Sequence, residues 1–315
     1  MALLALAILN GCERISTPKQ APPEVAPDSA EPAQAAPGAG LRVVASAELP
    51  AAPKRIVTLA PNVTEILFAL GAGERVVAVT RYDDYPADVK SLPKIGGIID
   101  VDLEAILTQK PDLVMGTSAG SDGALIAKLD KSKIPYLFVQ MNTLAETYGG
   151  IQAFGDALGL GDAAADLRAE MKSEIDAIAQ SANRDAAPHA RPRVLFVFGH
   201  DPLVAAGPGS YGDEMLTLVG AQNAVGDANN PYPVLDIEKI LSLNPDRIID
   251  ATITPDADPA PGGEGFWSTY ASLNAVKNGH VYYFQDPVLL RPAPRLVEGL
   301  KIMHKAINGT ASEDK

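Results

Sequence analysis

One segment of the chain matches a catalytic motif. Gly-Thr-Ser-Ala-Gly at 116–120 has the G-x-S-x-G spacing of a nucleophile elbow, in which a serine is exposed on a turn between a strand and a helix. Ser118 would then be the nucleophile of a serine hydrolase. No upstream His-Gly-Gly segment, of the kind that forms an oxyanion hole, accompanies it. A loop that contacts a ligand is therefore the preferred interpretation, and a hydrolase is the alternative of another class.

Two further patterns suggest chemistry only weakly. Gly-Pro-Gly-Ser-Tyr-Gly at 207–212 matches G-x-G-x-x-G, but a turn before a helix explains it better than a dinucleotide site. The four histidines are His189, His200, His280 and His304, and none lies at metal-ligand spacing from another. We therefore expect no metal site and no cofactor. Only His200 follows a strand pattern in a position suited to a ligand.

Composition narrows the class of protein. The 315 residues carry 26 Lys plus Arg against 39 Asp plus Glu, a formal net charge of −13. Such a surface repels phosphate backbones, so nucleic acid is not an expected partner. Apolar residues make up 47% of the chain, enough for sizeable cores in about two domains.

The N-terminal segment predicts export and anchoring. An apolar run at 1–9 precedes Gly11 and Cys12, the only cysteine, and resembles a bacterial lipoprotein signal in which Cys12 becomes lipidated. Residues 13–42 are rich in Pro and Ala without periodicity, as expected for a disordered tether. We therefore expect a membrane-tethered lipoprotein outside the cytoplasm, in the periplasm or at the cell surface.

Strand and helix patterns alternate along the first half of the folded part. Strands are predicted at 55–60, 75–80, 112–117 and 135–140, and helices at 62–73, 102–107 and 123–132. This alternation is typical of parallel βαβ units. A longer helix is predicted at about 162–180, because Leu167, Met171, Ile175 and Ile178 fall on one face.

The second half repeats the first. "DLEAILTQKPDLVMGT" at 102–117 returns 134 residues later as "DIEKILSLNPDRIIDAT" at 236–252. The run at 193–199 echoes 55–60, 213–225 echoes the helix and strand from 64 onward, a strand is predicted at 280–285, and a last helix at about 294–307. The second copy lacks a counterpart of the serine–glycine pattern at 116–120, so the architecture does not need it.

These patterns predict an α/β fold of two similar Rossmann-like lobes with mostly parallel sheets, joined by one long helix, with a ligand cleft between them. The predicted boundaries are 1–12 for the signal, 13–42 for the tether, 43–158 and 190–310 for the lobes, 159–189 for the connecting helix and 311–315 for the tail. Ligands of open parallel sheets bind beyond the carboxyl ends of the strands. The candidate contacts there are Arg81, Tyr82, Tyr85, Ile98, Ser118, His200, Tyr232, Asp286 and Arg291.

The aromatic candidates indicate what kind of ligand would bind. Tyr82 and Tyr85 follow a strand of the first lobe, and Tyr232 lies between two prolines in the second. Aromatic faces on both walls suit a large flat ligand better than a sugar or a bare ion.

Several ordered segments together resemble a known family. They are "RIVTLAPNVTEILFALGAGERVVAVTRYDDYP", "IGGIIDVDLEAILTQKPDLVM", "DPLVAAGPGSYGDEMLTLVGAQNAV" and "RPAPRLVEGL", with the long central helix. The chain resembles the substrate-binding proteins of bacterial ABC importers that serve cobalamin, haem and ferric siderophores, over about residues 54–307. It is most similar to the cobalamin-binding branch, because of Tyr82 to Pro86 and Pro231 to Pro233.

The resemblance implies a binding protein, not an enzyme, with a small metal chelate as ligand and an ABC permease dimer with its ATPase as partner. It implies that Tyr82 and Tyr232 flank a corrin, although Gly97, Ile98 and Ile99 replace a frequent tryptophan. Haem and ferric siderophores remain alternative ligands. Glu104 and Glu238, at the same place in the two repeats, resemble the glutamates that dock such receptors on permease arginines. We expect a monomer.

Overall fold

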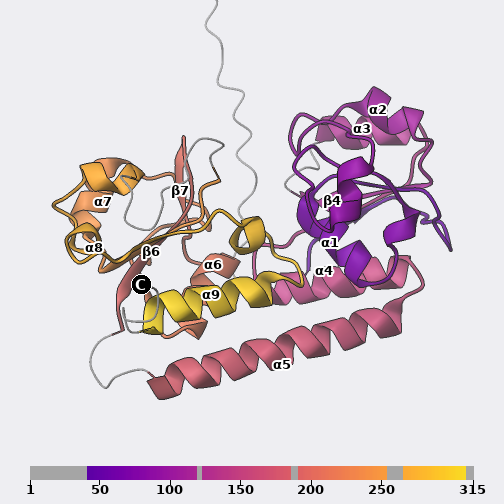
Figure 1. The fold of residues 1–315 in the computed structure, drawn as a ribbon. Helices are drawn as coiled ribbons and strands as arrows, with labels where there is room; N and C mark the ends of the chain where they lie inside the picture. The colour runs from indigo at the N-terminus through magenta and orange to yellow at the C-terminus, as the bar shows by residue number, and fades with distance from the viewer. Residues whose placement is uncertain (1–40, 119–122, 186–190, 254–264, 310–315) are drawn as a thin grey trace, which may run out of the picture. The chain divides into compact units, whose positions relative to one another are not determined.

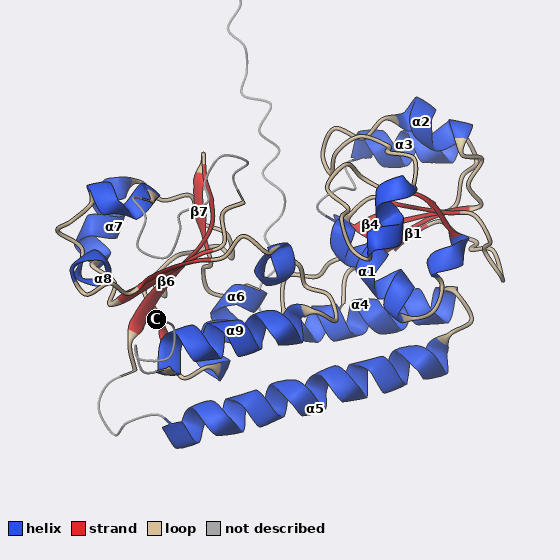
Figure 2. Ribbon diagram, in the orientation of Figure 1, coloured by secondary structure: helices blue, strands red, loops and turns tan. Residues whose placement is uncertain are grey.

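The computed structural model describes residues 41–118, 123–185, 191–253 and 265–309. They form a mixed α/β fold with two five-stranded sheets (Figures 1 and 2). The predicted signal, Cys12 and nearly all of the predicted tether lie outside the described residues. No helix within the described ranges combines the length and the apolar character needed to cross a membrane.

The first sheet has the order β1-β5-β4-β2-β3. Its strands are β1 (Val43–Ala45), β2 (Ile56–Thr58), β3 (Val76–Ala78), β4 (Leu113–Thr117) and β5 (Tyr136–Val139). All neighbours pair in parallel except β1, which runs antiparallel to β5. The associated helices are α1 (Pro61–Ala69), α2 (Leu103–Thr108), α3 (Gly123–Lys131) and α4 (Leu144–Ala157), with short 3₁₀ turns η1 (Gly73–Arg75) and η2 (Ala87–Ser91). This is the first lobe.

The second sheet has the order β10-β9-β6-β7, with β8 paired to the start of β6. Its strands are β6 (Arg193–His200), β7 (Leu203–Ala205), β8 (Gln222–Asn223), β9 (Arg247–Asp250) and β10 (Val281–Tyr283). Only β7 is antiparallel to its neighbour. The associated elements are α6 (Tyr211–Leu218), α7 (Ile237–Leu243), α8 (Asn274–Lys277) and α9 (Leu296–Asn308), with η4 (Phe266–Thr269) and η5 (Pro287–Leu290). This is the second lobe.

The long helix α5 (Gly161–Asp185) connects the lobes and packs along both α4 and α9 (Figure 2). The predicted stripe faces the core, where Met171 and Ile175 are buried. Arg168 Nη1 donates to Gln152 Oε1 of α4 at 2.6 Å, and Lys301 Nζ of α9 donates to Glu174. One helix therefore supports both halves.

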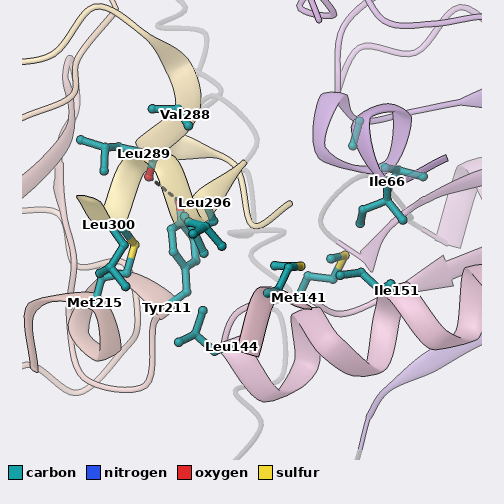
Figure 3. Packing of buried hydrophobic residues seen from close by; sticks show 14 of the residues in the cluster. Ile66, Met141, Leu144, Ile151, Tyr211, Met215, Val288, Leu289, Leu296 and Leu300 are labelled. Atoms are coloured by element: carbon teal, nitrogen blue, oxygen red, sulfur yellow. Dashed lines mark hydrogen bonds between the residues drawn. The ribbon is translucent and has the colours of Figure 1, made fainter. Parts of the chain in front are cut away.

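A single apolar cluster contains residues from both halves of the chain. Figure 3 shows Met141, Leu144 and Ile151 from the first lobe and Tyr211, Leu296 and Leu300 from the second, all of them buried. Tyr211 Oη donates to the carbonyl of Leu289 at 3.3 Å. Because these residues share one core, burial of apolar surface stabilises the connection between the lobes as well as each lobe.

The predicted fold class is confirmed, and its elements differ from the prediction in several places, which include the unpredicted β1 and α8. Helix α5 extends to Asp185 instead of about 180. Helix α4 was not predicted, because its glycines weaken the helical pattern. Gly155 is required there, since a Cβ on it would lie 2.4 Å from the Cβ of Ala164 in α5. Tertiary packing of α4 on α5 thus overrides a low intrinsic helix propensity. The domain boundaries given above stay a prediction.

Candidate functional site

The loop that follows β3 carries two exposed aromatic rings. Tyr82 is 51% exposed and Tyr85 is 44% exposed. The backbone beneath them is held, because Arg81 N donates to Gly96 O at 2.8 Å and Tyr82 N donates to Thr80 Oγ1 at 3.2 Å. The Arg81 guanidinium lies 5.3 Å from the centre of the Tyr82 ring and pairs with Asp100. The loop therefore presents aromatic surface from a fixed backbone.

Asp83 anchors this loop from inside. Its carboxylate is 4% exposed and accepts hydrogen bonds from Thr80 N at 2.9 Å and Thr80 Oγ1 at 2.5 Å. Burial raises the pKa of Asp83 above its ordinary value, and these hydrogen bonds oppose the shift. The strand-end rule also nominates Asp83, but the structure shows it as a buried anchor of the loop.

Two other predicted contacts of the first lobe follow nearby strand ends or turns. Ile98 is partly buried, and its neighbour Ile99 is 88% exposed. Ser118 follows β4 directly and is partly buried. Two of the Gly-Thr-Ser-Ala-Gly residues, 119 and 120, lie outside the described residues.

In the second lobe, His200 is held at the end of β6. Its Nε2 lies 2.7 Å from Asp250 Oδ2, and its ring stacks on Phe266 with centres 4.0 Å apart. Trp267 Nε1 donates to the same Asp250 oxygen at 2.6 Å. Asp250 is 2% exposed, so a buried carboxylate fixes both rings. This arrangement orients the imidazole at the predicted edge of the sheet.

Tyr232 has a different environment from Tyr82. Its ring packs against Phe198, with centres 5.7 Å apart, and the residue is partly buried. Burial, with the carboxylates of Glu146 and Glu214 nearby, raises the pKa of Tyr232 above its ordinary value. The residue two positions later, Val234, is 65% exposed. The Pro-Tyr-Pro loop therefore presents Val234 more openly than its tyrosine.

The segment after β10 reaches back to the first lobe. Arg291 Nη1 donates to Glu65 Oε1 at 2.9 Å and to Asp84 Oδ1 at 2.5 Å, while Arg291 Nη2 donates to the carbonyl of Tyr82 at 2.9 Å. Burial raises the pKa of Glu65, and the Arg291 guanidinium opposes this shift. Arg291, which was predicted to contact the ligand, is thus hydrogen-bonded to groups of the protein.

Asp286 and Arg295 extend this network. Asp286 Oδ2 lies 3.3 Å from Arg295 Nη2, and Asp286 Oδ1 accepts from Val288 N at 3.0 Å, which caps η5. The Arg295 guanidinium lies 4.0 Å from the centre of the Tyr85 ring. The structure therefore brings Tyr82, Tyr85, Asp286 and Arg291 into one network, while His200 and Tyr232 belong to separate contact groups.

Sequence reasoning missed several exposed apolar residues close to these positions. They are Ile99, Val234, Ile253 and Phe266, the last two being 47% and 37% exposed. Ile253 follows β9 by three residues, so the rule that strand ends line the site could have identified it. Phe266 contacts His200 only through the fold, and no local pattern indicated it.

A groove of about 450 Å³ lies beside Tyr85 and Arg295 and is lined by residues of α1, α5 and α9. Tyr85 is the one predicted ligand contact among the described residues that line it. Within the described ranges, no group of three His, Cys, Asp or Glu side chains is arranged to hold a metal ion.

Glu104 and Glu238 occupy matching positions at the starts of α2 and α7. Both are exposed, and each follows an aspartate cap, Asp102 or Asp236. The cap oxygens accept from Ala105 N at 3.1 Å and from Lys239 N at 2.7 Å. The two halves of the chain thus present a glutamate from the same local structure.

A family model described as periplasmic binding protein matches residues 56–288, which include both sheets apart from β1. The chain belongs to this family. It is similar to the ABC transporter substrate-binding lipoprotein YvrC of Bacillus subtilis, with 33% identity over 260 residues, 81% of this chain and 80% of that protein.

Two solved structures are similar in fold and sequence. The vitamin B12 binding protein BtuF of Vibrio cholerae matches with a TM-score of 0.70 and 26% identity, over 82% of this chain and 98% of that one. The haem-binding protein RhuT of Roseiflexus sp. RS-1 matches with a TM-score of 0.71 and 29% identity, over 81% and 98%. The family and these relatives are substrate-binding proteins rather than enzymes, which decides against the hydrolase interpretation of Ser118.

Proposed function

We propose that this protein is the extracytoplasmic receptor of an ABC importer for cobalamin or a related corrinoid, which it delivers to a membrane permease. The observation that carries the proposal is the exposed Tyr82 ring on a backbone fixed by hydrogen bonds. Exposed aliphatic side chains in the loops before α2 and α7, including Ile99 and Val234, also suit a large ligand with extensive apolar surface. The similarity to a vitamin B12 binding protein supports the same ligand class.

Titration with three chelates tests the ligand. Purified protein should bind cyanocobalamin in a saturable one-to-one manner, followed by calorimetry and by the ultraviolet–visible spectrum. Cobinamide should also bind if the corrin ring itself is the recognised surface. No cobalamin or cobinamide binding at tens of micromolar, together with haem binding, would reject the corrinoid proposal.

Haem, or a ferric siderophore, is the second candidate ligand. The similarity to the haem-binding protein RhuT favours haem, as does His200 at the end of β6, whose Nε2 is engaged by Asp250, so that Nδ1 would have to be the nitrogen that binds haem iron. If haem is the ligand, its absorption spectrum should shift on binding, and His200→Ala should change that spectrum. A spectrum identical in both proteins would argue against coordination by His200.

We further propose that Glu104 and Glu238 dock the receptor on a permease dimer coupled to its ATPase. A partner built from two equal subunits presents the same surface twice, so a receptor with two similar lobes can present the same charge twice. Both carboxylates are exposed and lie in matching first helical turns.

The third part of the proposal is a monomeric lipoprotein anchored through Cys12. The apolar run that ends at Gly11-Cys12 supports it, as does the name of the similar Bacillus subtilis protein. Cys12→Ser should release the protein from membranes without changing ligand affinity. A variant that stays with the membrane fraction would reject the lipid anchor.

A further inference from the structure

Arg291 joins the second lobe to the loop that carries Tyr82. The residue lies 209 positions after Tyr82, yet its guanidinium donates to the Tyr82 carbonyl and to the side chains of Asp84 and Glu65. The Arg291 side chain is 11% exposed and that of Glu65 is 2% exposed. The contact to Glu65 is therefore largely shielded from water, where charge-assisted hydrogen bonds are stronger than at an exposed surface, whereas Asp84 is half exposed.

The geometry leaves Arg291 poorly suited to contact a ligand directly. A guanidinium has five N–H donors in one plane, and the contacts to Glu65, Asp84 and Tyr82 occupy both of its terminal nitrogens. Two of these acceptors are carboxylates, so the positive charge is balanced within the protein. These contacts use three of the five N–H groups, and the side chain is only 11% exposed, so little of it is open to a ligand.

Arg295, four residues later, acts on the same loop from the other end. Its guanidinium lies over the Tyr85 ring and pairs with Asp286 at 3.3 Å. Together the two arginines hold the backbone at Tyr82 and the ring of Tyr85. Tyr82 itself keeps a half-exposed ring, so the loop combines a fixed backbone with an open aromatic face.

We propose that Arg291 is a positioning residue that locks the Arg81–Pro86 loop from the opposite lobe and thereby sets the orientation of Tyr82 before a ligand arrives. This rests on the proposed function in one respect, that Tyr82 contacts the ligand. A ring held in its binding orientation loses little conformational entropy when the ligand binds, so the lock increases affinity without touching the ligand. It also makes the lobe arrangement and the binding surface depend on one side chain.

The test combines hydrogen exchange of the ligand-free protein with cyanocobalamin affinity, measured for Arg291→Gln. Exchange of the amides of Thr80, Tyr82 and Asp83, which are hydrogen-bonded within the loop, should become faster. The dissociation constant should rise by roughly tenfold to hundredfold, as expected for loss of hydrogen bonds to a charged group. Arg291→Lys should recover only part of both effects, because one ammonium cannot span the three acceptors.

Arg247→Gln is the matched control. Arg247 is a partly buried arginine of the second lobe whose Nη1 donates to Tyr282 Oη at 2.9 Å, within the same sheet. The substitution removes the same charge, but Arg247 bonds to Tyr282 and not to the loop. The exchange rates of the loop amides and the cobalamin affinity should therefore stay at wild-type values. If Arg291→Gln does not fold, Asp84→Asn is the substitute, because it weakens the contact of Arg291 with a half-exposed side chain. It should also speed amide exchange and raise the dissociation constant, but by smaller factors.

The combination of exchange rates and affinity distinguishes a positioning role of Arg291 from direct contact with the ligand. Weaker binding with unchanged exchange would make Arg291 a direct ligand contact and overturn the proposal. Faster exchange with unchanged affinity would show that the lock does not serve binding, which also overturns it. Wild-type protein that binds neither corrinoids nor haem would reject the proposed function instead, and the exchange rates would then decide alone whether Arg291 holds the loop.

Discussion

The two copies of the repeated segment, 102–117 and 236–252, share their local hydrogen bonds as well as their sequence. Arg55 N donates to Asp112 at 2.9 Å in the first lobe, and Arg193 N donates to Asp246 at 2.9 Å in the second. The same two arginine side chains each reach a carbonyl at the end of the repeated helix, that of Gln109 or of Leu243, at 2.6 Å. The helix ends of the two lobes are thus built alike.

The copies differ where their strands end. Asp250, at the end of β9, is buried and bonded to His200 and Trp267, whereas its counterpart 134 residues earlier is Gly116. A Cβ on Gly116 would lie 2.9 Å from the Phe138 ring. The two copies are therefore alike at their helices and unlike at their strand ends, and the proposed docking and ligand-binding roles assign different tasks to these two regions.

The largest expected effect concerns the shared surface. Glu104→Lys combined with Glu238→Lys should abolish association with the permease, because like charges facing each other across an interface cost several kcal/mol. Each single reversal should weaken association by a similar amount if the two lobes meet equivalent surfaces. Binding to the permease in detergent or nanodiscs, measured at several salt concentrations, checks this.

Ligand affinity of the same variants is the control. It should stay at the wild-type value, since both glutamates are exposed and lie at the starts of helices rather than at strand ends. A parallel loss of affinity would show that the glutamates serve the lobes themselves. Full transport by the double variant would mean that the repeat has no docking role.

The second expected effect concerns the unlike strand ends. Asp250→Ala should lower the free energy of unfolding by about 3 kcal/mol, because it leaves the Trp267 and Thr252 N–H groups without their acceptor. Gly116→Ala should cost less, about 1–2 kcal/mol, through overpacking against Phe138. Urea unfolding followed by Trp267 fluorescence measures both, and equal losses would show that the two strand ends are energetically alike.

Substitutions of Tyr82 and Tyr232 should affect different properties, ligand binding and stability respectively. Tyr82→Ala should weaken cobalamin binding by about 1–2 kcal/mol with little effect on unfolding, because the ring is half exposed. Tyr232→Ala should mainly destabilise the fold, since its ring packs on Phe198. If Tyr82→Ala binds cobalamin with unchanged affinity, Tyr82 is an ordinary surface residue and not a ligand contact.

The smallest expected effect tests whether the repeats are energetically equivalent. Asp102→Ala and Asp236→Ala each remove a helix cap and should each cost about 1 kcal/mol of unfolding free energy. Thermal and urea unfolding of the two variants should give the same loss. A clear difference would show that packing around α2 and α7 differs more than their hydrogen bonds do.

The sequence was sufficient wherever the signal was local. The strands β2 and β4, the short repeated helices α2 and α7, and the apolar stripe on α5 were all predicted from local residue patterns, and each is present in the structure. Helix α4 was missed because Gly149, Gly150 and Gly155 lower its propensity. The structure explains them by close approaches to Leu41, Met141 and Ala164 of α5, respectively. The rule for strand ends nominated the candidate site, which stays a prediction, and it could not say which side chains there are exposed and which are bonded to the protein.

What the sequence alone determined is the duplicated α/β scaffold, because hydrophobic periodicity and capping act over a few residues. What only the tertiary structure decided is which side chains remain available at the strand ends. Arg291 and Glu65 are 226 positions apart, and no spacing rule could pair them. Whether a polar residue is open to a ligand or engaged by the protein depends on burial and on partners brought together by the fold, and those are properties of the folded chain.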